Sequence, residues 1–379
     1  MSATFARHFL VASLAASALV ACSSRGSSGA SDTRIQRDSV NAAPVGAASP
    51  EVKVTAGEAS KAFNPRLLRR FTPLRTRIDS TENPPSEDKI ALGRMLYFDK
   101  RLSRNQDVAC NSCHHLDAYG VDGQATSVGD KGQHGGRNAP TVYNAAGYLS
   151  QFWDGRARDV EEQAKAPILN PVEMAMPSSA AVVARLKSIP GYVTAFQKAF
   201  PAEKDPVTYD NLGRAIGVFE RGLTTPARWD KFLVGDKTAL TAGEIEGLKI
   251  FTNVGCMVCH TGELLGGNSY QRAGAVEAWA TQDDVGRQNV TKNVSDRMMF
   301  KVPTLRNIEK TAPYFHDGSA KTLEEAVHVM GEHQLGLDLS NEEIAAIVTW
   351  LHSVTGELPT AYIAEPQLPP GPEKLADSK

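Results

Sequence analysis

The sequence predicts a mainly helical protein with long loops, an all-α fold in which one plan is used twice. Three observations support this prediction. Apolar residues recur at helical spacing along the chain, whereas no stretch shows convincing strand alternation. Three patterns of the capping-box type mark helix starts: Thr241-x-x-Glu244, Thr322-x-x-Glu325 and Ser340-x-x-Glu343. The motif C-x-x-C-H occurs twice, 146 residues apart, each time between a predicted helix and a long irregular segment.

In the first half, the apolar residues Leu92, Met95 and Leu96 lie one helical turn apart and predict a helix. The elements expected here are a helix over 86–102, a loop over 116–136, a helix from about Arg158 that carries Gln163 and stops before Pro167, two short helices over 180–200 separated at Pro190, and an amphipathic helix over 209–223.

The second half repeats the plan. We expect a helix from Thr241 that runs into Cys256, followed by Gly-rich irregular chain up to about Phe300. Thr322-x-x-Glu325 predicts a short helix that ends near Met330, and the last helix, begun by the box at Ser340, is expected to stop at Gly356. The Pro-rich tail after Leu358 is expected to be irregular.

The N-terminal residues have the composition of an export signal. Residues 1–21 contain a short apolar stretch that closes with Leu-Val-Ala before Cys22, which resembles the lipobox of bacterial lipoproteins. We expect cleavage before Cys22, a lipid anchor on its sulfur and a periplasmic protein held at a membrane. The alternative is a plain secretory signal that leaves a free protein. Residues 22–65 are rich in Ser, Ala and Gly and are interpreted as a flexible linker.

Composition limits the functional classes. The chain has 379 residues, enough for two domains, and its 41 basic and 43 acidic residues give no strong field for nucleic acid. It has five cysteines. Four belong to the two C-x-x-C-H motifs and the fifth is Cys22, so no pair is left for a disulfide.

The two C-x-x-C-H motifs predict two covalent c-type haems. In each motif the two cysteines lie one helical turn apart, so both thiols can add to one porphyrin. The pairs are Cys110 with Cys113 and Cys256 with Cys259. The adjacent His114 or His260 then supplies the proximal iron ligand. A single motif could be a zinc half-site or a redox dithiol. Zinc would need a second thiol pair or paired histidines nearby, and neither follows either motif.

This arrangement, helix, C-x-x-C-H, loop and helix used twice, resembles cytochrome c domains in tandem. The expected organisation is an N-terminal haem domain over 66–228, a C-terminal haem domain over 229–362 and an irregular tail over 363–379.

From about Asp79 to Ile363 the chain resembles the bacterial di-haem cytochrome c peroxidases. The resemblance implies reduction of hydrogen peroxide to water with two electrons from a small periplasmic cytochrome c or cupredoxin, and a possible homodimer. It depends on eight ordered segments: both C-x-x-C-H motifs, Arg137–Thr141, Gln151–Ala157, Asn170–Met174, Phe300–Asn307, Tyr314–Gly318 and Met330–Leu335.

The resemblance also implies roles for single residues. The haem on His260 accepts electrons, with a methionine as second iron ligand; Met298, Met299 and Met330 are all candidates by position, and the family pattern selects Met330. The resemblance places His316 against a propionate of this haem. The haem on His114 is the peroxide site, where Glu173 moves protons and Gln163 positions the oxygens. Trp153 lies between the haems. From position alone, Glu173 would be an ordinary surface acid and Trp153 a buried aromatic.

A calcium ion is implied as well. Its expected ligands are the side chain of Asn138 and the backbone carbonyls of Thr311 and Pro313, all hard oxygens of the kind calcium prefers. From sequence alone, Asn138 before Ala and Pro is equally typical of a turn.

The chain departs from the family at one position. In many members a histidine in the loop after the first motif caps the peroxide iron in the oxidised enzyme, and ungapped counting places that position at Asp130. Aspartate is a poor haem-iron ligand, and His134 is out of register. We therefore expect the first haem to be uncapped at rest.

Two other functions fit parts of the sequence. A non-enzymatic two-haem electron carrier would have both irons six-coordinate and no peroxide turnover. A relative of the di-haem enzyme that matures methylamine dehydrogenase would have tyrosine where this chain has Met330. Met330, Glu173 and Gln163 favour the peroxidase.

Overall fold

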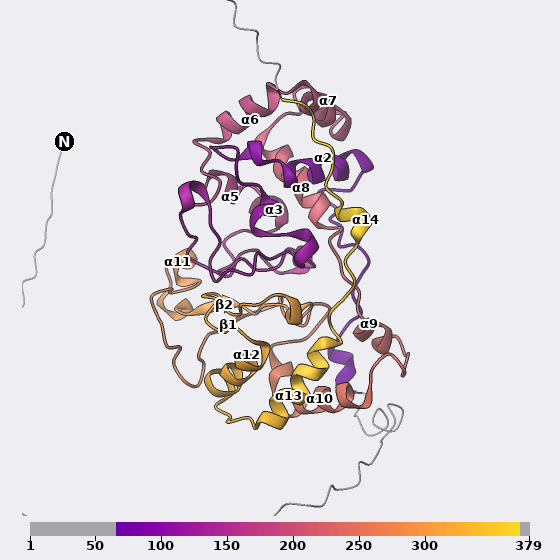
Figure 1. Ribbon diagram of the computed structural model, residues 1–379, viewed down its shortest axis with the longest axis vertical. Helices are drawn as coiled ribbons and strands as arrows, with labels where there is room; N and C mark the ends of the chain where they lie inside the picture. The colour runs from indigo at the N-terminus through magenta and orange to yellow at the C-terminus, as the bar shows by residue number, and fades with distance from the viewer. Residues whose placement is uncertain (1–65, 372–379) are drawn as a thin grey trace, which may run out of the picture. The chain divides into compact units, whose positions relative to one another are not determined.

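The computed structural model describes residues 66–371, which form a mainly helical fold (Figure 1). The predicted signal peptide, the lipidated Cys22, the linker and the last eight residues of the predicted tail lie outside the described residues. Between residues 66 and 371, no helix has the length and apolar character needed to cross a membrane.

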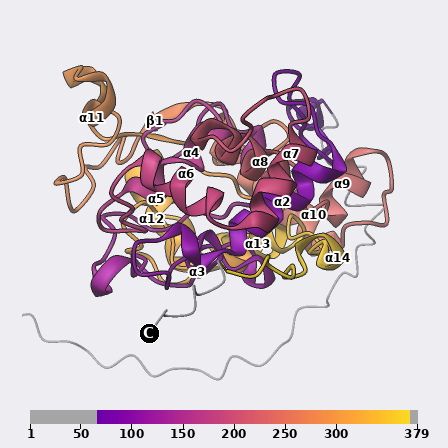
Figure 2. The ribbon, with the colours of Figure 1, turned by 90° about the horizontal axis from the view of Figure 1, so that it is seen from above.

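The first hydrophobic core is built on α2 (Glu87–Phe98) and α8 (Tyr209–Glu220). Ser86 caps α2 through the backbone N–H of Lys89, as its position before an apolar periodic stretch requires. The helices approach closely because a Cβ on Gly93 would collide with the carbonyl of Ala215. Figures 1 and 2 show these helices with α6 (Ser179–Lys187) and α7 (Pro190–Ala199) beside them.

The second core is built on α10 (Ala242–Asn253) and α13 (Asn341–His352). Two of the three predicted capping patterns begin these helices and form full capping boxes: Thr241 with Glu244 begins α10, and Ser340 with Glu343 begins α13. Two further helices of this half are α9 (Arg228–Leu233), which brings Trp229 to this core, and α12 (Leu323–Val329), which continues as a π-helical segment over Met330–Leu335.

The ends of the described chain pack on the opposite core. Phe71 belongs to the second core, although it precedes the first in sequence, and its ring meets Trp229 edge-on at 5.3 Å. Ile363 belongs to the first core, and Tyr362 stacks on Phe219 at 5.2 Å. The expectation of irregular chain after Leu358 is therefore wrong at α14 (Thr360–Ile363), where burial of Ile363 and Tyr362 orders a helical turn.

The helix that carries Gln163, α4 (Val160–Gln163), does stop before Pro167, which lies in the first turn of a separate short helix, α5 (Ala166–Leu169), where its missing N–H costs nothing. Two other local expectations are corrected. β1 (Tyr270–Arg272) and β2 (Met299–Lys301) form an antiparallel pair in the segment expected to be irregular. α13, which was expected to stop at Gly356, ends at His352. The role of Gly356 is to allow a close backbone contact, because a Cβ at this position would collide with the carbonyl of Thr225.

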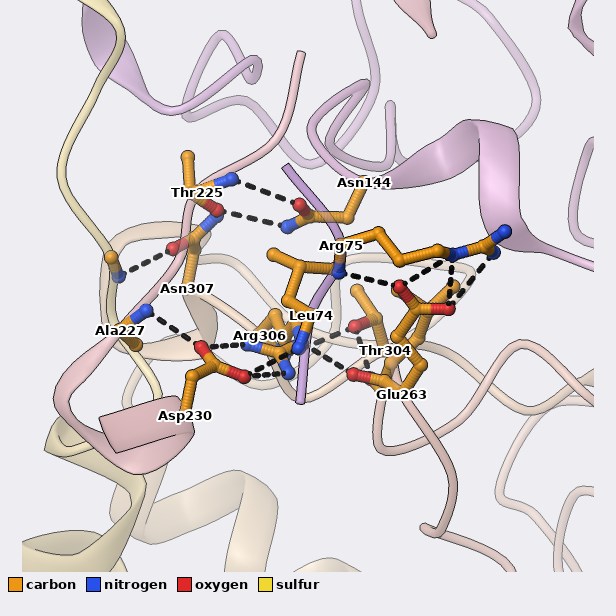
Figure 3. Close-up of polar contacts among 12 residues, drawn as sticks. Leu74, Arg75, Asn144, Thr225, Ala227, Asp230, Glu263, Thr304, Arg306 and Asn307 are labelled. Atoms are coloured by element: carbon orange, nitrogen blue, oxygen red, sulfur yellow. Dashed lines mark hydrogen bonds and ion pairs between the residues drawn. The ribbon is translucent and has the colours of Figure 1, made fainter. Parts of the chain in front are cut away.

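A buried polar network joins the two halves of the described chain (Figure 3). The carboxylate of Asp230, on α9, accepts hydrogen bonds from both terminal nitrogens of Arg306, at 2.9 and 2.8 Å. It also accepts from the backbone N–H groups of Leu74 and Ala227, each at 2.7 Å. Arg306 is fully buried, and its Nε donates to the carbonyl of Glu263 at 2.6 Å. Because every charge in this network has a partner, it can remain in the interior.

A second polar contact lies beside it (Figure 3). The hydroxyl of Thr225 accepts from the side-chain amides of Asn144 and Asn307, each at 2.9 Å. Asn144 comes from the first half of the chain and Asn307 from the second, so Thr225 connects the segments that carry the two motifs.

Candidate functional site

A cavity of about 550 Å³ lies beside α3 (Cys110–Cys113), the short helix of the first C-x-x-C-H motif. Its lining brings together residues that the sequence separates widely. The motif supplies Cys110, Cys113 and His114; the other lining residues used below are Trp153, Gln163, Glu173, Glu220 and Lys301.

The two motif histidines have the same hydrogen-bond arrangement. Nδ1 of His114 donates to the carbonyl of Gly120 at 3.2 Å, and Nδ1 of His260 donates to the carbonyl of Leu265 at 3.0 Å. A histidine whose Nδ1 proton is held by a carbonyl presents Nε2 as the metal ligand. Burial also lowers the pKa of both rings, which keeps them neutral, as ligation requires.

The four motif cysteines are free thiols in half-buried positions. Cys110 and Cys113 occupy the two ends of α3, one turn apart. Burial raises the pKa of the Cys256 thiol to about 12 and raises that of Cys259 as well. Two thiols one turn apart beside a neutral imidazole fit a porphyrin that carries two vinyl groups.

Glu173 and Gln163 both line this cavity. Gln163 is the last residue of α4 (Val160–Gln163), whose start is capped by Asp159. Glu173 follows α5 in irregular chain, where the amide of Asn170 donates to its Oε1 at 2.8 Å. Burial raises the pKa of Glu173, although the positive charge of Arg156 opposes this. A carboxyl with a raised pKa in a cavity can accept a proton and return it.

Trp153 also lines the cavity, and it packs on a second aromatic cluster formed by Trp279, Met298 and Phe300. Its Nε1 donates to the carbonyl of Asn138 at 3.0 Å. The Trp153 ring lies 6.3 Å from the ring of His316, which is buried and stacked on Phe300 at 4.1 Å. Trp153 thus contacts both the cavity of the first motif and this cluster.

The structure brings Met330 and Met298 into the same surroundings. Met330 packs on the aromatic cluster of Trp279 and Phe300, and Met298 is a member of that cluster. Met299 lies in β2 and is only half-buried. Leu335, at the end of the π-helical segment that Met330 begins, lies beside Gly255, the residue before the second motif. This segment therefore approaches the second motif.

The expected calcium residues lie on segments that contact each other. The backbone N–H of Asn138 donates to the carbonyl of His316 at 2.8 Å, and His316 follows Thr311 and Pro313 along one loop. The Asn138 amide nitrogen donates to the carbonyl of Gln124 at 2.9 Å, which leaves its amide oxygen for a cation. No cluster of three His, Cys, Asp or Glu side chains suited to a metal occurs in residues 66–371, but this oxygen set is of another kind.

Asp130 and His134 lie outside the lining of the cavity, as far as the described residues show. The buried carboxylate of Asp130 accepts from the amide of Asn105 at 2.7 Å, and its backbone N–H donates to the carbonyl of Glu173 at 2.8 Å. His134 is exposed, and its Nδ1 lies 3.3 Å from the hydroxyl of Thr126.

Two further lining residues were not predicted from the sequence. Glu220 is buried on α8, and burial raises its pKa to about 8. Its position four residues after Ile216, on the apolar face of the helix, was a signal that could have identified it. Lys301 is also buried, and burial lowers its pKa to about 7 although Asp154 opposes this. The sequence feature that could have identified Lys301 is its position between two apolar residues, Phe300 and Val302.

A mainly helical chain with two such thiol and imidazole sites is a haem-binding protein. Residues 87–238 match the family model described as di-haem cytochrome c peroxidase. The chain is 48% identical to cytochrome c551 peroxidase of Nitrosomonas europaea over 291 residues, 76% of this chain and 85% of that protein. It is 44% identical to cytochrome c551 peroxidase of Pseudomonas aeruginosa over 309 residues, 80% of this chain and 88% of that protein.

The chain therefore belongs to the di-haem cytochrome c peroxidase family, and it is a peroxidase. Its fold is also similar to that of a MauG-like protein associated with microbial copper homeostasis. That comparison has a TM-score of 0.70 and 28% identity, and covers 80% of this chain and 99% of the other. The identity to this MauG-like protein is lower than the identity to the two cytochrome c551 peroxidases.

Proposed function

We propose that this peroxidase reduces hydrogen peroxide to water in the cavity beside His114, with electrons that enter through the site of His260. One observation carries the proposal: a single cavity is lined by Cys110, Cys113 and His114 together with Glu173 and Gln163. The first three residues would hold a haem covalently, and this haem would supply the iron at which peroxide is reduced. The same roles fall to Cys256, Cys259 and His260 at the second site.

Glu173 is the proton-transfer group in this proposal. Peroxide must lose a proton from one oxygen, and the other oxygen must gain one before it leaves as water. The Glu173 carboxyl can perform both transfers because burial raises its pKa and Asn170 fixes one of its oxygens. The Gln163 amide, on the same cavity wall, holds the peroxide oxygens in position.

The direct test is steady-state consumption of hydrogen peroxide by the haem-loaded protein with a reduced small cytochrome as donor. We expect two donor molecules to be oxidised for each peroxide consumed. A fully loaded protein that leaves the donor reduced in the presence of peroxide would contradict the proposal and favour the electron carrier.

Trp153 is the proposed connection between the two sites. It lines the first cavity and packs on the cluster that contains Phe300 and Met330. An indole in this position shortens the gap that an electron must cross. His316, buried among Trp153, Trp279 and Phe300, is proposed to bind a propionate of the second haem.

Met330 is the proposed second ligand of the iron at His260. In a Met330→Leu variant, we expect the reduction potential of the second haem to fall, because a thioether raises the potential of a haem. Electronic absorption and redox titration of each haem would measure the change. The matched control is Met298→Leu, which alters a neighbouring methionine of the same cluster. Loss of the methionine ligand in Met298→Leu, with none in Met330→Leu, would assign the role to Met298.

We infer that the first haem is uncapped in the oxidised enzyme. This inference is supported by Asp130, which bonds to Asn105, and by His134, which is exposed and lies beside Thr126. The EPR spectrum of the oxidised enzyme is therefore expected to contain a high-spin ferric signal, and peroxide should react without prior reduction. Low-spin signals alone, with a high-spin signal that returns in His134→Ala, would show that His134 is a cap.

A calcium ion is proposed at Asn138 and the carbonyls of Thr311 and Pro313. Because the contact of Asn138 with His316 joins segments of the two halves, calcium there would fix their relative placement. We expect a chelator to lower peroxide turnover, and calcium to restore it better than magnesium, which demands stricter octahedral geometry. Atomic emission that finds no calcium in the active protein would contradict this site.

The cellular context is also a proposal. We propose a periplasmic enzyme, anchored through lipid on Cys22, that receives electrons from a small cytochrome c or cupredoxin and that can form a homodimer. Mass spectrometry of the mature N-terminus would test the anchor, since an unmodified N-terminus other than Cys22 would contradict it. The two haem domains are proposed to cover residues 66–228 and 229–362.

A further inference from the structure

Lys301 is a buried cation that comes to the first cavity from the other half of the chain. It is the last residue of β2, and only 6% of its surface is exposed. Its backbone N–H donates to the carbonyl of Trp153 at 2.8 Å, and it pairs with Tyr270 across the two-stranded sheet. These contacts fix the strand beside the cavity wall that Trp153 forms.

The alternation of side chains along β2 directs neighbouring residues to different sites. Phe300 stacks on His316, within the aromatic cluster that Met330 joins. Lys301 lines the cavity of the first motif instead. In the view of Figure 1, β2 lies between α3 of the first motif and α12 of the second half. One short strand therefore contributes to the surroundings of both predicted haems.

The Lys301 ammonium has a ring for a neighbour and no acidic partner. Its Nζ lies 3.8 Å from the centre of the Tyr148 ring, a cation–π contact. Within residues 66–371 no carboxylate forms an ion pair with it. The nearby acids are used elsewhere: Asp154 pairs with Arg137 at 2.7 Å and with Arg156 at 3.1 Å. Burial of a cation without an anion is costly, so an anionic group that enters the cavity with its ligand would stabilise the charged form of Lys301.

We propose that Lys301 binds a carboxylate of the group held in this cavity, which is a haem propionate if the proposed function is correct. Its positive charge then favours the reduced state of the first haem, because reduction adds negative charge to the site. Lys301 is thus a binding residue supplied to the first haem by the second half of the chain.

The test is the reduction potential of each haem in the haem-loaded protein, followed by redox titration of the absorption spectrum. In Lys301→Met and Lys301→Gln, we expect the equilibrium constant for reduction of the first haem to fall about tenfold, a shift of about 59 mV for a one-electron couple. The second haem should change much less. Lys301→Arg should keep most of the wild-type potential, because it retains the charge.

The matched control is Lys198→Met, which removes the same charge from an exposed position on α7. Unchanged potentials in Lys301→Met and Lys301→Gln, with both haems present, would overturn the proposal and leave Lys301 as a support for Tyr148. If neither variant folds, a crystal structure of the haem-loaded wild type decides: Nζ farther than about 4 Å from every haem carboxylate overturns it. Absence of two covalent haems from the wild type would instead contradict the proposed function.

Discussion

The Glu173→Gln variant is expected to consume peroxide about 10²–10⁴-fold more slowly than the wild type, the usual contribution of a positioned acid–base group. Glutamine keeps the shape of the side chain and can still contact Asn170, but it can neither accept nor return a proton. Steady-state kinetics of the haem-loaded protein with a reduced small cytochrome would measure the loss. We expect the absorption spectra of both haems to stay unchanged, since Glu173 is not an iron ligand.

The pH profile separates a proton-transfer role from a structural one. Burial raises the pKa of Glu173, so the wild-type rate should fall as the pH drops through a value above the ordinary glutamate pKa of about 4.3. The base form is the one that accepts the peroxide proton, and it is lost below that pKa. In Glu173→Gln this acidic limb should disappear.

A matched control lies on the neighbouring helix. Glu162 is exposed on α4, next to Gln163, and Glu162→Gln makes the same chemical change outside the cavity lining. This variant should retain wild-type turnover and the acidic limb. Full activity in Glu173→Gln would remove Glu173 from the mechanism and leave Gln163 or another lining group to move the proton.

Local sequence signals predicted the helix starts well, because capping depends on residues within one turn. Ser86, Thr241 and Ser340 each cap the helix expected of them. Helix ends and short strands were predicted less well. β1 and β2 are three residues each, too short for an alternating pattern, and they pair only because the chain between them returns. Gly356 was predicted to end a helix, whereas it allows close contact with Thr225, a residue distant in sequence.

The site was predictable to the extent that its residues lie in continuous motifs. Cys110, Cys113 and His114 can be identified from spacing alone, and the resemblance added Glu173 and Gln163, which do line the same cavity. The sequence marks Lys301 and Glu220 as charges at apolar positions, but it does not show that they line this cavity, because that depends on residues distant in sequence that pack around them.

A substitution in the buried network of Figure 3 is expected to have the largest effect on stability. In Arg306→Met, the carboxylate of Asp230 would lose its charge partner while it stays buried, and breaking such a pair costs about 3–5 kcal/mol. The control is Arg75→Met, whose partner Glu263 belongs to the same region but whose side chain is 58% exposed. Arg75→Met should lower the free energy of unfolding by only about 0.2–1 kcal/mol. Urea unfolding of the haem-loaded proteins would measure both.

The pH dependence of the free energy of unfolding distinguishes loss of the ion pair from a packing defect. Burial alone would raise the pKa of Asp230, but the hydrogen bonds and charge of Arg306 outweigh it and lower the pKa. The stabilisation that this lowering provides is present above the ordinary aspartate pKa of about 3.9, and it is lost as the pH falls through the folded-state value. The difference in unfolding free energy between wild type and Arg306→Met should therefore shrink in acid.

A double variant separates the charge from the rest of the network. Asp230→Leu with Arg306→Met leaves no buried charge, so it should be less destabilised than Arg306→Met alone. It should still fall below the wild type, because the N–H groups of Leu74 and Ala227 would lose their acceptor, at about 1–3 kcal/mol for a buried donor left unpaired. A double variant as unstable as the sum of both single variants would show that the ion pair itself contributes little, and that shape and backbone hydrogen bonds hold α9 against the second core.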